Sequence, residues 1–157
     1  WGYPGVGKDY IAKKFCKLAK IKYLDGDTFL TVKDKTKLMH QTFTKEDRKK
    51  KLSRIVNYLK KEGGDLAITD SLPDQKSRKF LQESLQGNVK FILVKSTRKL
   101  HTDRIRKRKG HFFKQEMIEG YIKKYWKPVR KFPHAIITNN KSVATEKSLK
   151  KIIQKNW

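Results

Sequence analysis

The sequence predicts an α/β fold in which helices cover both faces of a parallel β-sheet. Short apolar, β-branched runs alternate along the 157 residues with longer stretches whose apolar residues recur at helical spacing. Strands that are joined through helices run parallel, because each crossover returns the chain to the same end of the sheet. The length corresponds to one domain, residues 1–157, which is enough to bury a substantial core.

The same patterns place the individual elements. We expect strands at residues 22–25, 66–69, 88–94 and 135–138. We expect helices at residues 7–20, 73–86, 97–109, 114–126 and 142–155, and a helix with a loop between 28 and 43. A further helix begins after Thr44, which has the spacing of a capping box with Asp47, and ends at Gly63.

The first residues of the chain contain a phosphate-binding motif. Gly2-Tyr3-Pro4-Gly5-Val6-Gly7-Lys8-Asp9 fits the pattern G-x-x-x-x-G-K-[ST] at every fixed position except the last. The glycines permit positive φ, so that successive backbone N–H groups can surround an anion at the start of a helix. Lys8 can then reach the β- and γ-phosphates. The alternative is a glycine-rich turn that caps an ordinary helix. We interpret these eight residues as a loop that binds the phosphates of ATP.

Asp9 is the departure from the motif. A serine or threonine at this position normally places its hydroxyl on Mg²⁺. A carboxylate can also bind Mg²⁺, but it adds a negative charge beside the triphosphate. Either the metal is held in an altered way or catalysis is weakened, and the sequence leaves both open.

A buried strand normally precedes such a loop, whereas only Trp1 precedes Gly2. We therefore expect a gap in the sheet between the strand that ends at Asp70 and the strand through Phe91 to Val94. A strand of typical length would require about five to eight further residues before Trp1 in the natural protein.

The net charge of +25 indicates an affinity for anions. The basic residues are mostly lysines and are spread over nearly every segment, without interleaved aromatic residues. This distribution favours an enzyme for anionic substrates that also binds polyanions nonspecifically, while a dedicated nucleic-acid-binding protein stays open. The lone Cys16 is expected to be buried and fits a reducing, cytoplasmic compartment. No apolar run is long enough to span a membrane.

Acidic residues follow two of the expected strands. Asp25-Gly26-Asp27 places two carboxylates on a bend, where one can hold Mg²⁺ through water and the other can take the proton of a substrate hydroxyl. The alternative is an acidic turn that caps the next helix. Because ligands bind beyond the carboxyl ends of parallel strands, we expect these residues to lie near Asp70 and Asn139.

A basic segment from residue 104 to 109 precedes Gly110-His111-Phe112-Phe113. On a helix Arg104 and Arg108 share a face, where two guanidinium groups can surround a phosphoryl group in transfer. The glycine and the apolar residues after it suit a mobile lid. The alternative is a solvated basic helix.

These segments resemble the bacterial gluconate kinases. Residues 104–113 resemble the family's lid segment, R-[LI]-x-x-R-x-G-H-F, and Pro128 takes the place of the proline that follows it. Tyr23-Leu24-Asp25-Gly26-Asp27 resembles the family's Y-x-D-G-D. Leu38-Met39 with Thr44-Lys45-Glu46-Asp47-Arg48 resembles its K-M…T-D-D-D-R, and Asp70-Ser71-Leu72 with Arg78 stands near its C-S-A-L-K…Y-R. The similarity covers nearly the whole chain in the family's order.

The resemblance implies a three-layer P-loop NTPase fold of the shikimate-kinase type, with a helical lid at about 104–127. Its strand order would be 2-3-1-4-5, the strand before Gly2 being the first. It also implies Mg²⁺-dependent transfer of the γ-phosphoryl group of ATP to a hydroxyl of a sugar acid. The implied roles are ATP binding by residues 2–9, Arg104, Arg108 and Asn139; substrate binding by Asp27, Arg48, Asp70, Arg78 and His111; metal binding by Asp9 and Asp25; and catalysis by Lys8, Asp27, Arg104 and Arg108.

The departures from the family concern the acceptor more than ATP. Leu30 replaces a histidine, Pro73 replaces a lysine, and Lys49-Lys50-Lys51 replaces W-x-W. Gly120-Tyr121-Ile122 replaces S-Q-F in the lid helix. The identity of the acceptor therefore stays open. The sequence also leaves open whether the protein forms a homodimer. The alternative to a gluconate-kinase-like enzyme is a diverged nucleotide-binding relative with weak or no kinase activity.

Overall fold

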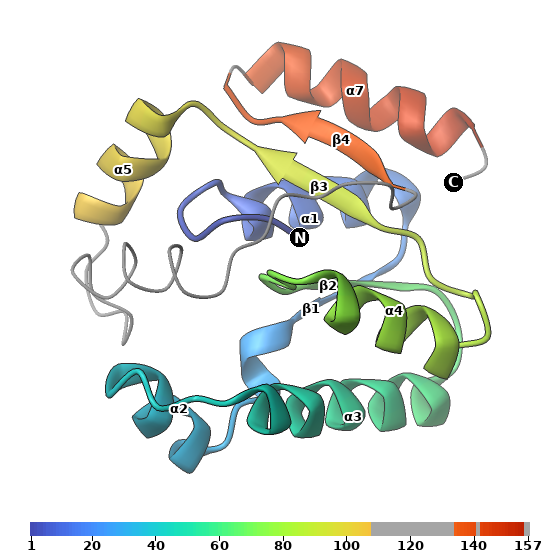
Figure 1. The fold of residues 1–157 in the computed structure, drawn as a ribbon. Coiled ribbons are helices and arrows are strands. Elements are labelled where there is room, and N and C mark those ends of the chain that lie inside the picture. Colours follow the sequence, from blue (N-terminus) through green and yellow to red (C-terminus); the bar gives the residue numbers. More distant parts are fainter. Residues whose placement is uncertain (108–133, 141, 156–157) are drawn as a thin grey trace.

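The protein is described by a computed structural model that covers residues 1–107, 134–140 and 142–155. Helices and strands alternate as the sequence predicts (Figure 1). The helices are α1 (Lys8–Ala19), α2 (Val32–Met39), α3 (Lys45–Glu62), α4 (Gln75–Ser84), α5 (Arg98–Arg106) and α7 (Ser142–Gln154), with a 3₁₀ helix at Gly26–Phe29. The strands are β1 (Lys22–Asp25), β2 (Leu66–Thr69), β3 (Ile92–Lys95) and β4 (Ala135–Thr138).

The strands form two parallel pairs. β1 pairs with β2 in a register that places Asp25 opposite Thr69, and β3 pairs with β4 in a register that places Lys95 opposite Thr138. Within the described residues no strand joins β2 to β3. The order β1-β2, gap, β3-β4 matches the expected order 2-3-1-4-5 with its first strand missing, so the predicted gap is confirmed.

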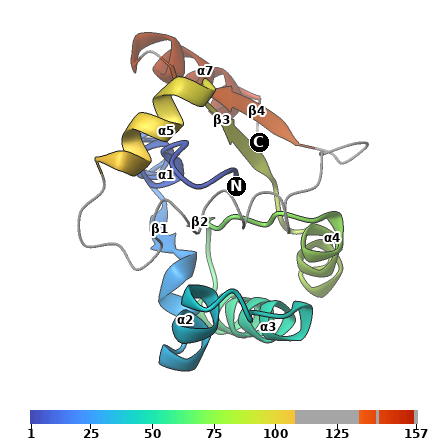
Figure 2. The same cartoon turned by 60° about the vertical axis from the view of Figure 1, so that its left-hand side comes forward.

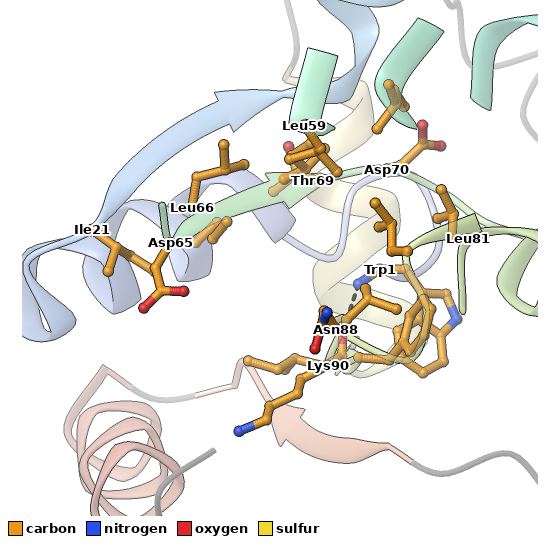
Figure 3. Close-up of a pocket in the computed structure, with 18 of the residues that line it drawn as sticks. Trp1, Ile21, Leu59, Asp65, Leu66, Thr69, Asp70, Leu81, Asn88 and Lys90 are labelled. Carbon is orange, nitrogen blue, oxygen red and sulfur yellow. Dashed lines mark hydrogen bonds between the residues drawn. The ribbon is translucent and has the colours of Figure 1, made fainter. Parts of the chain in front are cut away.

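Trp1 lies at one end of this gap (Figure 1). Its amine donates to the carbonyl of Ile92 at 2.5 Å, and the N–H of Val94 donates to the Trp1 carbonyl at 2.7 Å. This pair of bonds is the pattern of a parallel strand pair. Trp1 therefore occupies one position of a strand beside β3, and a cavity of about 1010 Å³ continues from it between the two pairs (Figure 3).

Each face of the sheet has its own core. Phe91 and Leu93 point to one side, where they join a cluster formed by α3, α4 and Trp1. Ile92 and Val94 alternate with them and join a cluster with α1, β4 and α7 on the other side. Figure 2 shows α3 and α4 side by side, away from α7. The sheet is thus covered by helices on both faces, as expected.

Side-chain caps fix the helix starts near the carboxyl ends of the strands. Thr44 and Asp47 form the predicted capping box at α3. Thr31 and Asp34 form a second one at α2, in the stretch whose structure the sequence left ambiguous. Cys16 is buried within α1, as predicted.

The predicted strand 88–94 is partly wrong, because β3 begins only at Ile92. The N–H of Asn88 donates to the Leu85 carbonyl and that of Val89 to the Gly87 carbonyl, so these residues complete the turn after α4. The helix expected from 97 begins at Arg98, with Thr97 as its cap. The helix expected at 114–126 lies outside the described residues.

Candidate active site

The glycines of the predicted phosphate loop adopt conformations that other residues rarely reach. Gly5 and Gly7 have φ of 81° and 84°. A Cβ on Gly5 would lie 2.7 Å from Ile105 of α5, and a Cβ on Gly7 would lie 2.5 Å from the Asn139 amide. The loop is therefore packed between α5 and the segment after β4, and side chains at these glycines would displace it.

Helix α1 begins at Lys8, directly after the loop, with Gly7 as its N-cap. The first N–H groups of α1 have no partner within the helix and carry its positive dipole end, which favours an anion at this point. The Lys8 ammonium donates to the carbonyl of Tyr3 at 3.1 Å, so the cation lies against its own loop. The loop, the start of α1 and the Lys8 side chain together provide the groups of an anion-binding site.

Arg104 and Asn139 fasten the loop from outside. The Asn139 amide donates to the carbonyl of Val6 at 2.8 Å, and Nη1 of Arg104 donates to the same carbonyl at 3.1 Å. Nη2 of Arg104 donates to the Asn139 carbonyl at 3.3 Å. Both predicted ATP-binding residues thus adjoin the loop and hold its main chain. Arg108 and His111 lie outside the described residues.

A group of acidic and phenolic side chains lies beside the loop. Asp25, at the end of β1, accepts the N–H of Asp27 at 2.9 Å. Burial, and then the charges of Asp27 and Asp9, raise the pKa of Asp25. Burial raises the pKa of Tyr23 to about 12, with smaller contributions in the same direction from Asp9 and Asp25. The two predicted metal-binding residues, Asp9 and Asp25, are therefore brought near each other.

Among the described residues no three histidine, cysteine, aspartate or glutamate side chains form a metal cluster. Mg²⁺ in kinases is held by only one or two carboxylates, with water and substrate phosphates completing its shell. Asp9 and Asp25 fit that requirement. A cation between them would also offset the repulsion that contributes to the raised pKa of Asp25.

The predicted acceptor residues surround the ends of β1 and β2. Asp70 follows β2, and its Oδ2 lies 2.7 Å from the ammonium of Lys51. Asp27 lies 3.4 Å from the same ammonium. Gly26 packs on the end of β2, since a Cβ there would collide with the Thr69 carbonyl. The structure thus brings Asp27 and Asp70 together through a lysine.

The two arginines assigned to the acceptor carboxylate lie deeper. Arg48 is 3.7 Å from Asp74 and only 10% exposed. Arg78 is 1% exposed, donates to the Leu72 carbonyl at 2.7 Å and lies over the Trp1 ring. Arg48 and Arg78 therefore line the interior behind the acidic residues, and their contact with an acceptor stays a prediction.

Lys51 is the residue that sequence reasoning missed, because it appeared only as part of a departure from a family pattern. A usable signal existed. Arg48, Lys51, Leu52 and Ile55 recur at helical spacing, and all four are buried on one face of α3. A lysine on an otherwise buried face requires an acidic partner inside the protein.

The large cavity in the sheet adjoins this site, because Lys8 and Asp70 both line it. Much of the rest of its lining is the apolar interior beside β2 and β3, including Leu66 and Leu81 (Figure 3). Its other polar residues include Asp65, Asn88 and Lys90. A space with that lining suits apolar side chains rather than a triphosphate.

Solved structures share this architecture. An unliganded sugar kinase from Janibacter sp. superposes with a TM-score of 0.79 at 19% identity, covering 98% of this chain and 89% of that one. A gluconokinase from Sinorhizobium meliloti gives 0.78 at 17% identity, covering 99% and 91%. The chain has the fold of P-loop small-molecule kinases. A shikimate kinase from Acinetobacter baumannii, in complex with shikimate, gives 0.66 at 17% identity, covering 99% and 90%.

The other comparisons add no closer relative. No protein-family model matches the sequence, and no curated protein matches it. At these identities the likeness establishes the P-loop kinase fold alone. In the described part of the chain, no helix has the length and apolar character needed to cross a membrane.

Proposed function

We propose that the protein is an ATP-dependent kinase that transfers the γ-phosphoryl group to a hydroxyl of a small, anionic acceptor, a sugar acid. One observation carries the proposal: α1, which begins at the phosphate loop, packs against β1 and β2, and the acidic segments that follow these two strands meet where Gly26 packs against Asp70. The charge of Asp9 also raises the pKa of Asp25. A site for a phosphate donor thus adjoins a site for a hydroxyl acceptor.

The chain's own residues supply the required steps. The loop amides and Lys8 bind the phosphates, and Asp9 with Asp25 would hold Mg²⁺, which neutralises phosphate charge. Asp27 accepts the proton of the acceptor hydroxyl while the hydroxyl oxygen attacks the γ-phosphorus, and ADP leaves. We propose that Arg104 and Arg108 stabilise the negative charge that develops on the phosphoryl group during transfer.

An anionic acceptor is supported by the net charge of +25, which attracts anions. The fold neighbours include a shikimate kinase with shikimate bound, and an APS kinase from Mycobacterium tuberculosis in complex with AMPPNP and APS. The lone, buried Cys16 fits our further proposal of a cytoplasmic location.

The test is a coupled assay of ADP release with gluconate, related sugar acids and shikimate. We expect release that depends on both Mg²⁺ and one of these acceptors, and that Lys8→Ala abolishes. Tight ATP binding without release for any acceptor would contradict the proposal and favour a nucleotide-binding relative without turnover.

The net charge of +25 and Asp9 favour that second candidate, a nucleotide- or polyanion-binding protein. A nucleic-acid-binding function predicts an affinity for RNA or DNA that falls steeply with salt and that survives Lys8→Ala. The kinase proposal predicts that only weak, nonspecific binding of this kind remains at physiological salt.

A further inference from the structure

Lys51 is a buried cation to which the proposed reaction assigns no step. It lies on the inner face of α3, and its side chain is 7% exposed. Burying an ammonium is costly unless carboxylates pair with it in good geometry. Its position in the protein is therefore set by its acidic partners.

Two acidic partners of Lys51 differ in their surroundings. Its Nζ lies 2.7 Å from Oδ2 of Asp70, whose side chain is 8% exposed, and 3.4 Å from Oδ1 of Asp27, whose side chain is 46% exposed. One partner is an interior carboxylate and the other faces solvent. The Lys51 ammonium thus bridges a buried carboxylate and a carboxylate of the proposed acceptor site.

Asp70 itself is held in place. Its Oδ1 accepts the N–H of Ser71 at 2.6 Å and that of Leu72 at 3.4 Å. Burial alone would raise the pKa of Asp70, but Lys51 and then Arg48 hold it below its usual range. Asp70 is therefore a fixed anion, and it fixes the ammonium in turn.

Asp27 lies in the 3₁₀ helix that follows β1, and its carboxylate is partly exposed to solvent. This helix packs on β2 through Gly26, which leaves no room for a side chain next to the Thr69 carbonyl. The contact with Lys51 is a charge-assisted bond from the interior to this exposed carboxylate. It restricts where the carboxylate can lie.

We infer that Lys51 is a positioning residue, which holds the Asp27 carboxylate at the end of β2 in the orientation that meets the acceptor hydroxyl. The inference rests on the proposed function, in which Asp27 takes the hydroxyl proton. Lys51 contacts the Asp27 carboxylate and acts on the acceptor only through it. A displacement of about 1 Å at a reacting group can cost about 100-fold in rate, so the fixed orientation has a measurable value.

The experiment compares kcat and acceptor KM for the wild type, Lys51→Met, Lys51→Arg and Lys51→Met in the Asp70→Asn background. That background matters because Lys51→Met alone leaves the buried Asp70 carboxylate without its cation, which can unfold the protein. Asp70→Asn alone is its reference. Lys50→Met, at the exposed neighbouring position, is the matched control for the loss of one charge. ATP affinity is measured for every variant by calorimetry.

We expect Lys51→Met, alone and combined with Asp70→Asn, to lower kcat about 10- to 100-fold relative to the wild type, with a smaller change in acceptor KM and unchanged ATP affinity. Lys51→Arg should retain most of the activity. A wild-type kcat in both Lys51→Met variants, or a loss of ATP affinity parallel to kcat, would show a purely structural ion pair and overturn the inference. No turnover by the wild type with any acceptor would instead overturn the proposed function, and the inference with it.

Discussion

Arg104 and Asn139 share a single acceptor, the main-chain carbonyl of Val6 in the phosphate loop, and Arg104 also donates to the carbonyl of Asn139. The three residues come from the loop, from α5 and from the end of β4. Their bonds join the loop to the segment that leads into the expected lid. The conformation of the loop therefore depends on α5, the helix at which the lid is expected to begin.

This contact predicts the effect of Arg104→Ala. The loop loses one of its two donors at Val6, so its amides are less well ordered for a phosphate. We expect ATP to bind about 10-fold more weakly, as one charged hydrogen bond is worth about 1.5–3 kcal/mol at most. Calorimetry with ATP measures it. Arg106→Ala is the control, because Arg106 is exposed on the same helix. Equal effects from the two variants would refute a role of Arg104 at the loop.

Arg108 lies beyond the described residues, and its role follows from the sequence. Arg108→Ala should lower kcat by about 1,000-fold while ATP affinity changes little, because the guanidinium acts on charge that grows in the transition state. Single-turnover rates beside binding constants separate the two effects. If Arg106→Ala lowered kcat as much, the segment would be an ordinary basic helix.

The fold could be predicted from the sequence because its signals are local. Thr44 and Asp47 are three residues apart, and the strand that ends at Asp70 is a short apolar run between polar residues. The gap beside Phe91 followed from a motif that normally has a strand before it. The predicted start of β3 is too early. Val89 is apolar and β-branched, as strand residues often are, but its main-chain N–H bonds to the Gly87 carbonyl in the turn after α4.

The site could be predicted only in part, because its remaining features depend on distant contacts. Lys51 and Asp27 are separated by 24 positions, and nothing near either one shows that they meet. Arg78 was assigned to the acceptor by resemblance, whereas its burial depends on Leu72 and Trp1. The partners of a buried charge are decided by packing rather than by spacing.

Asp9 offers a test of how the metal is held. Asp9→Ser replaces a carboxylate by a hydroxyl ligand and removes one of the charges that raise the pKa of Asp25. We expect turnover at saturating Mg²⁺ to rise, because less negative charge lies beside the γ-phosphate. Initial rates across a Mg²⁺ titration provide the measurement. Loss of all activity in Asp9→Ser would mean that the carboxylate is an adapted, required ligand.

Asp47 predicts a specific dependence of stability on pH. The Lys37 ammonium at 2.6 Å, together with the Thr44 cap, lowers the pKa of Asp47 to about 2. A carboxylate whose pKa is lowered by folding stabilises the protein above its unfolded pKa, and this contribution is lost as the pH falls toward 2.

Asp47→Asn should therefore reduce the free energy of unfolding near neutral pH by about 1 kcal/mol or more, the usual value of a helix cap. The difference from the wild type should shrink below about pH 4. Urea unfolding between these pH values measures it, with Glu46→Gln at the exposed neighbouring position as control. A difference that stays constant with pH would show that the cap does not depend on charge.

The cavity between β2 and β3 predicts the effect of apolar residues placed before Trp1 in the 157-residue chain. Trp1 already bonds to Ile92 and Val94 in the pattern of a parallel strand pair. A β-branched, apolar segment of about five residues before it would continue the pairing with β3 and fill the cavity.

We expect this segment to raise the Tm of the 157-residue chain by at least about 5 °C, since each added main-chain bond in the interior avoids an unpaired group worth about 1–3 kcal/mol. A glycine-serine segment of the same length is the control, because it supplies main chain without apolar side chains. Thermal unfolding measures both. An apolar segment that stabilises no more than this control would show that the space between β2 and β3 does not accept a strand.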